Sequence, residues 1–151
     1  MGNDLMVTRT TVLNTHAARV WELLTDPQYT REYMFNCEVC STWQKGSEIS
    51  WKGEFEGQDI YQKGEILEII PGRLLSYTTF DAKSGPPDNP INYIHVTYKL
   101  IPKNGHTELV TTLSNFGGHA VRAENAAHNW DFIVLPKLKE LAEAPEYSKL
   151  K

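Results

Sequence analysis

The sequence predicts an α+β fold in which an antiparallel sheet of six to seven strands packs on a long C-terminal helix. Two observations predict this fold. From residue 120 to residue 144, apolar side chains recur at steps of three, four and seven, as on one face of a helix. Before this segment, short stretches that alternate apolar and polar residues are separated by turns, as in antiparallel strands with one solvated face. Helices that all lie on one face of such a sheet are typical of the α+β class.

The N-terminal part of the chain predicts one strand and two short helices. Residues 7–13 are rich in β-branched side chains and predict the first strand. Asn14 or Thr15 is expected to cap a helix over residues 17–25, where apolar side chains follow helical spacing. Asp26-Pro27 ends this helix and begins a second one that extends to about Tyr33.

The middle of the chain predicts a series of hairpins. Turns at residues 56–59, 71–73 and 103–105 separate segments of alternating polarity. The predicted strands are residues 49–55, 60–70, 74–80, 94–100 and 109–113. Residues 82–90 contain three prolines and one glycine and predict a long loop, of the kind that often covers a binding site. Because no repeat or linker interrupts the pattern, residues 1–151 are expected to form a single domain.

The final helix, predicted over residues 120–144, would be about 36 Å long, enough to cross a small sheet. Its apolar stripe consists of Ala123, Ala127, Trp130, Ile133, Val134, Leu138 and Leu141. Pro136 lies within the helix and removes one backbone hydrogen bond. We therefore expect the helix to be kinked or divided in two near this residue.

Composition excludes several classes of function. The net charge of −4, without a clustered basic segment, argues against binding of nucleic acid. No apolar run reaches 18 residues, so no membrane span is expected. The N-terminus lacks the basic and apolar regions of a signal peptide, which makes the cytoplasm the expected location.

Metal and cofactor sites are not expected either. Cys37 and Cys40 form a C-x-x-C motif in an extended segment, where positions i and i+3 point to opposite faces. This placement favours two unrelated thiols over a redox pair or half of a zinc site. The five histidines are scattered, and no phosphate-binding loop occurs.

Three motifs together resemble a known family. They are VWELLTDP at residues 20–27, GEILEIIPGRL at residues 64–74, and Asn129-Trp130 on the final helix. In this order and spacing, over residues 7–141, the chain resembles the START-like (SRPBCC) superfamily. The most similar branch is related to the C-terminal domain of the activators of heat-shock protein 90 ATPase.

The resemblance implies a helix-grip fold, in which a curved antiparallel sheet wraps around the C-terminal helix and encloses a cavity. The superfamily includes lipid carriers, hormone receptors, polyketide cyclases and aromatases, so the fold alone does not define the function. In this branch, many members are bacterial single-domain proteins. The N-terminal domain of the eukaryotic co-chaperones is absent here, which argues against a direct chaperone role.

Alternation along the strands predicts which side chains face the helix. The expected set combines strand residues with the stripe of the helix and one polar residue: Trp51, Phe55, Tyr77, Tyr98, Leu113, Asn115, Trp130, Ile133 and Val134. If these side chains fill the space between sheet and helix, they form an ordinary core. If a gap remains, they line an apolar pocket with polar groups from Tyr77, Tyr98 and Asn115. The residues leave both readings open, and the resemblance favours the pocket.

Candidates for catalysis are weak. Glu54 and His95 alternate with apolar neighbours and are expected to face solvent, and no nucleophile and base occur at a recognised motif spacing. Arg9 and Arg73 are expected on the solvated surface. The leading hypothesis is therefore binding of a small hydrophobic molecule, such as a lipid, polyketide or flavonoid, without catalysis and without a cofactor. A chaperone ATPase-linked adaptor or stress-response protein, and a cyclase or hydrolase that uses a polar cavity residue, are the alternatives.

Overall fold

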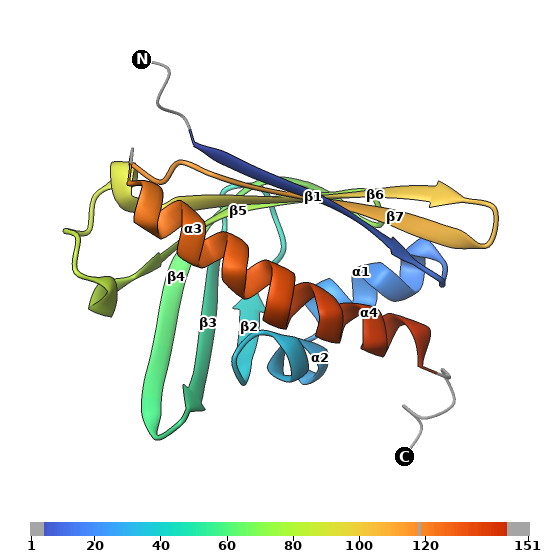
Figure 1. Cartoon of the computed structure of the whole chain (residues 1–151), viewed down its shortest axis with the longest axis horizontal. Coiled ribbons are helices and arrows are strands. Elements are labelled where there is room, and N and C mark those ends of the chain that lie inside the picture. Colours follow the sequence, from blue (N-terminus) through green and yellow to red (C-terminus); the bar gives the residue numbers. More distant parts are fainter. Residues whose placement is uncertain (1–4, 118, 145–151) are drawn as a thin grey trace.

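The computed structural model describes residues 5–117 and 119–144. A seven-stranded antiparallel sheet in the order β1-β7-β6-β5-β4-β3-β2 curves over the C-terminal helical segment (Figure 1). Its strands are β1 (Met6–Leu13), β2 (Cys37–Ser41), β3 (Glu48–Phe55), β4 (Gln58–Ile70), β5 (Leu74–Asp81), β6 (Ile94–Lys103) and β7 (His106–Ser114). The predicted α+β, helix-grip architecture is confirmed.

The helices lie on one face of this sheet (Figure 1). They are α1 (Ala17–Thr25), α2 (Pro27–Tyr33), α3 (Ala120–Asn129) and α4 (Leu135–Glu143), with a π-helical turn η3 (Trp130–Val134) between α3 and α4. Helix α4 packs against α1, α2 and β1, whereas α3 lies over the other end of the sheet. None of the described helices is long and apolar enough to cross a membrane.

The capping of α1 differs from the prediction. Neither Asn14 nor Thr15 is the cap; His16 occupies that position, and its Nδ1 accepts a hydrogen bond of 3.3 Å from the Arg19 N–H. Asp26 caps α2 as predicted, because its carboxylate accepts a hydrogen bond of 2.9 Å from the Gln28 N–H. The side chain of the N-cap residue thus satisfies an N–H group of the first turn in both helices.

Pro136 divides the final helix, as predicted, but by a π turn. Proline lacks an N–H group and its ring clashes with the carbonyl four residues earlier, so the chain widens before it. The Leu135 N–H donates to the Trp130 carbonyl across the wider turn. The buried face therefore differs from the predicted stripe around the turn. Ile133 is 39% exposed, whereas Leu135 and Ala142, which are not in the predicted stripe, are buried together with Leu138.

A bidentate ion pair connects β1 to the π turn. Arg9 donates to Asp131 through Nε at 2.7 Å and through Nη2 at 3.0 Å. Both side chains are partly exposed, so Arg9 lies on the surface as expected but is fixed there by a partner. The hydrogen bond from Arg9 lowers the pKa of Asp131.

Because this pKa is lowered in the folded protein, the pair stabilises the fold at pH values above the unfolded pKa of about 3.9, and the contribution is lost as pH falls through the folded pKa. Asp131→Asn is expected to lower the free energy of unfolding by about 0.5–1 kcal/mol at pH 7, a modest effect because the pair is half exposed. Urea unfolding at pH 7 and below pH 4 measures this difference. A difference that is equally large at both pH values would contradict the assignment, and Glu140→Gln, in an exposed pair with Lys137, is the control.

Candidate ligand-binding cavity

A cavity of about 410 Å³ lies between the concave face of the sheet and α3. Its apolar walls come from inward-facing residues of β3, β4, β6 and β7, from the two residues that follow α2, and from α3: Met34, Phe35, Trp51, Ile60, Ile94, Val96, Leu113 and Ala126. Polar side chains interrupt these walls at a few positions. The space between sheet and helix is therefore only partly filled by side chains.

Three polar residues of the sheet line the cavity. Thr79 Oγ1 donates a hydrogen bond of 2.9 Å to Gln62 Oε1, which links these two side chains from neighbouring strands. Asp81 lies at the end of β5, where its carboxylate accepts a hydrogen bond of 2.9 Å from the Lys83 N–H and caps the 3₁₀ turn η1 (Ala82–Ser84). These contacts hold the polar groups of the sheet in place.

Trp51, Leu113 and Trp130 line the cavity, and strand alternation or the helical stripe predicts the position of each. Tyr77 and Tyr98 lie beside it and are fully buried, with ring centroids 6.4 Å apart. The Tyr77 ring lies 5.7 Å from the Trp51 ring, so the aromatic wall continues into the core.

The remaining predicted residues do not line the cavity. Phe55 is 41% exposed because it stands near the tip of the β3–β4 hairpin, where its ring contacts Phe35 edge to face at 5.6 Å. Ile133 is turned outward by the π turn, and Val134 is fully buried in the core. Asn115 has a left-handed backbone, with φ of 65°, and its amide donates to the carbonyls of Pro90 and Tyr93. Asn115 therefore anchors the loop after β5.

Sequence reasoning missed three polar residues of α3 that line the cavity, namely Arg122, Asn125 and Asn129. They recur at steps of three and four and flank Ala126 on the helix. In the sequence, these residues form a polar stripe that runs beside the apolar stripe at the same helical spacing, which indicates that they share its side of the helix. Because polar helix residues most often face solvent, this pattern alone does not predict that they line a cavity.

Buried polar groups surround this aromatic wall. Burial raises the pKa of Tyr98 to about 12, and it raises the pKa of the Cys37 thiol to about 11, with the negative charge of Asp81 adding to the latter rise. Tyr98 Oη and Trp130 Nε1 are both buried and have no hydrogen-bond partner in the described part of the chain. The Tyr77 hydroxyl and the Trp130 indole partly oppose the rise in the pKa of Tyr98, through polar contacts that fall short of good hydrogen-bond geometry.

Cys37 is buried and Cys40 is exposed, as the prediction that they point to opposite faces requires.

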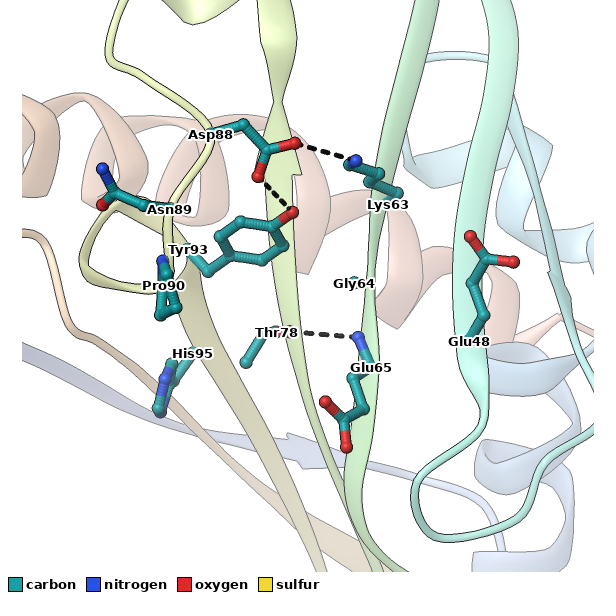
Figure 2. A pocket seen from close by; sticks show the side chains of 10 residues that line it. All are labelled: Glu48, Lys63, Gly64, Glu65, Thr78, Asp88, Asn89, Pro90, Tyr93 and His95. Carbon is teal, nitrogen blue, oxygen red and sulfur yellow. Dashed lines mark hydrogen bonds and ion pairs between the residues drawn. The ribbon is translucent and has the colours of Figure 1, made fainter.

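A second hollow, of about 480 Å³, lies on the opposite face of the sheet (Figure 2). Asp88 of the loop after β5 pairs with Lys63 at 2.8 Å and accepts a hydrogen bond of 2.7 Å from the Tyr93 hydroxyl. His95 lines this hollow, so it points away from the helix as predicted, and partial burial lowers its pKa. With Glu48 and Glu65 also in its lining, this hollow is charged and suits an apolar molecule poorly.

The curved antiparallel sheet, the long helix against it and the cavity between them define a START-like domain of the helix-grip class. The family model described as activator of Hsp90 ATPase homolog 1-like protein (AHSA1) matches residues 14–143, and the chain belongs to this family. The predicted branch of the superfamily is thereby confirmed. Among curated proteins, none shows significant similarity to the chain.

Solved structures share this fold over nearly the whole chain. ChR145 from Cytophaga hutchinsonii is 35% identical, with a TM-score of 0.76 over 92% of this chain and 94% of that one. The Aha1 dimer from Colwellia psychrerythraea is 15% identical, with a TM-score of 0.72 over 93% and 97% of the two chains. DynU16, a protein in the dynemicin biosynthetic locus, is 18% identical, with a TM-score of 0.72 over 92% of this chain and 47% of that one. The last two similarities concern the fold alone.

Proposed function

We propose that the protein binds a small, largely hydrophobic molecule in the cavity between the sheet and α3. The cavity itself is the observation that carries the proposal. Its volume of about 410 Å³ falls within the range of about 300–1,000 Å³ that is usual for small-molecule sites. Aromatic walls with a few fixed polar groups are also typical of such sites. The location of DynU16 in a biosynthetic locus agrees with a small organic ligand.

The titratable groups of the lining favour binding over covalent catalysis. With a pKa of about 11, the Cys37 thiol is protonated at neutral pH and is a poor nucleophile. Asp81 is engaged with the backbone of η1. The enzyme alternative, a cyclase or hydrolase, needs a carboxylate or histidine in the cavity, and among the described lining residues Asp81 is the candidate for that role. The adaptor alternative stays a prediction that family membership alone supports.

We infer that the ligand enters past Phe35. An outer groove lies between α2, the tip of the β3–β4 hairpin and the π turn, and its apolar side chains Phe55, Phe132 and Ile133 are exposed. Phe35 lines both this groove and the inner cavity, so its ring separates the two. Phe35 and Asn36 both have left-handed backbones, with φ of 51° and 62°, which costs some backbone strain, and the Phe35 ring packs edge to face on Phe55.

Phe35→Ala is expected to join groove and cavity and to accelerate ligand exchange. Because the barrier falls for entry and exit alike, the association and dissociation rates should both rise, by about tenfold if about 1.4 kcal/mol of the barrier is removed. The dissociation constant should change much less. Stopped-flow fluorescence with N-phenyl-1-naphthylamine measures both rates. Phe132→Ala, which alters only the outer groove, is the control, and unchanged rates in Phe35→Ala would show that entry occurs elsewhere.

The binding proposal itself is tested with the same neutral, apolar fluorophore. Titration should give a saturable rise in fluorescence at one molecule per chain. In NMR spectra, the indole N–H signals of Trp51 and Trp130 should shift, because both rings line the cavity, while those of Trp21 and Trp43 should not. Failure to saturate, or shifts confined to Trp21 and Trp43, would refute the proposal.

A further inference from the structure

The charge distribution in the cavity points to one side chain, Arg122. It lies near the start of α3 and lines the cavity. Its Nη2 donates a hydrogen bond of 3.1 Å to the carbonyl of Asn92, in the 3₁₀ turn η2 (Pro90–Asn92) before β6. The guanidinium is thus held in place by the turn that precedes β6.

The second terminal nitrogen of Arg122, Nη1, has no hydrogen-bond partner among the residues that the structure describes. Nη1 is buried and forms no hydrogen bond within the described residues, and no described carboxylate pairs with this side chain. By contrast, Arg9, Arg19 and Arg31 each pair with a carboxylate, at 2.7, 3.3 and 3.1 Å respectively. The Arg122 side chain is partly buried, and its Nη1 is shielded from water, so an anionic oxygen that reached Nη1 would give this atom the hydrogen-bond partner it lacks.

The carboxylate in the same cavity does not supply this anion. Asp81 accepts a hydrogen bond from the Lys83 N–H, and its charge raises the pKa of Cys37, which places it toward β2. Arg122 is held instead beneath Asn92, before β6. Among the described residues, no ion pair joins Asp81 to Arg122.

We propose that the ligand carries an anionic oxygen group, such as a carboxylate or phenolate, that binds Arg122 while its apolar body lies against Trp51 and Leu113. This proposal rests on the binding function proposed above and narrows the ligand to an amphipathic organic anion. A guanidinium with one nitrogen already held is preorganised for such a group, because it loses little side-chain freedom on binding. A neutral lipid would leave Nη1 without a partner.

Two fluorophores with the same apolar body test the proposal. 8-Anilinonaphthalene-1-sulfonate differs from N-phenyl-1-naphthylamine by one sulfonate, an anionic oxygen group. The wild-type protein is expected to bind the sulfonate about tenfold more tightly than the neutral compound. Arg122→Gln should remove this preference, because the glutamine amide carries no charge.

The variants separate the two proposals. Arg122→Lys should keep part of the preference, and Arg73→Gln, at an exposed arginine between β4 and β5, should leave it unchanged. Equal affinity for both compounds, unaffected by Arg122→Gln, would overturn the anion proposal and leave hydrophobic binding intact. Absence of saturable binding for both compounds would overturn the proposed function itself. Circular dichroism of each variant confirms that it is folded before affinities are compared.

Discussion

Ala126→Phe is expected to abolish binding of N-phenyl-1-naphthylamine while the protein stays folded. Ala126 is buried on α3 and lines the cavity, so a phenyl ring at this position would occupy the space that the ligand needs. We expect affinity to fall by at least about 100-fold, which corresponds to about 2.7 kcal/mol. Stability should change little or rise, because the ring fills a void and displaces no packed atoms.

Val121→Phe is the matched control for this substitution. Val121 lies on the same helix but is 66% exposed, so a phenyl ring there points into solvent. Fluorescence titration of both variants, with thermal unfolding followed in parallel, separates blocking of the cavity from a general effect on α3. Undiminished affinity in a folded Ala126→Phe variant would place the binding site outside this cavity.

Gly64→Ala is expected to cause a large loss of stability. Gly64 lies in β4 beside Thr78 of the neighbouring strand β5 (Figure 2), two residues before a register shift between Ile66 and Glu68. A Cβ atom on Gly64 would overlap the carbonyl oxygen of Thr78, and backbone atoms move less readily than the end of a side chain. We expect the free energy of unfolding to fall by about 3 kcal/mol, and the melting temperature by roughly 10 °C.

Gly57→Ala distinguishes this steric effect from backbone strain. Gly57 has φ of 81°, and nothing lies within 4 Å of a Cβ atom placed on it. An alanine there is strained but meets no neighbour, so the expected cost is about 1–2 kcal/mol. Urea unfolding of both variants measures the difference. A Gly64→Ala variant no less stable than Gly57→Ala would mean that the backbone of β5 at Thr78 moves away from the new Cβ atom at little cost.

The fold was predictable because its main signals are local. Alternation along a strand and spacing along a helix depend only on nearby residues, and they place Trp51, Leu113 and Trp130 correctly on the wall between sheet and helix. They also separate Cys37, which is buried, from Cys40, which is exposed.

The rest of the site depends on features that the sequence pattern does not encode. Phe55 has the right alternation, but the hairpin extends past the helix and leaves its ring half exposed. Ile133 has the right helical spacing, but the π turn before Pro136 rotates it outward. The role of Arg122 depends on the carbonyl of Asn92, 30 residues earlier in the chain, and on the absence of any described carboxylate beside it. Such tertiary contacts override local propensity.

The π turn also bears on how this protein can evolve. If the same residues formed an uninterrupted α-helix in place of the π turn, Leu138 and Ala142 would be rotated by about 100° relative to α3, away from the core they now fill. The turn therefore lets two helical halves with different tasks share one axis. Helix α4 keeps the segment seated on α1, α2 and β1, while α3 presents its side chains to the cavity. Substitutions of the α3 side chains that line the cavity therefore leave the contacts of α4 with α1, α2 and β1 unchanged.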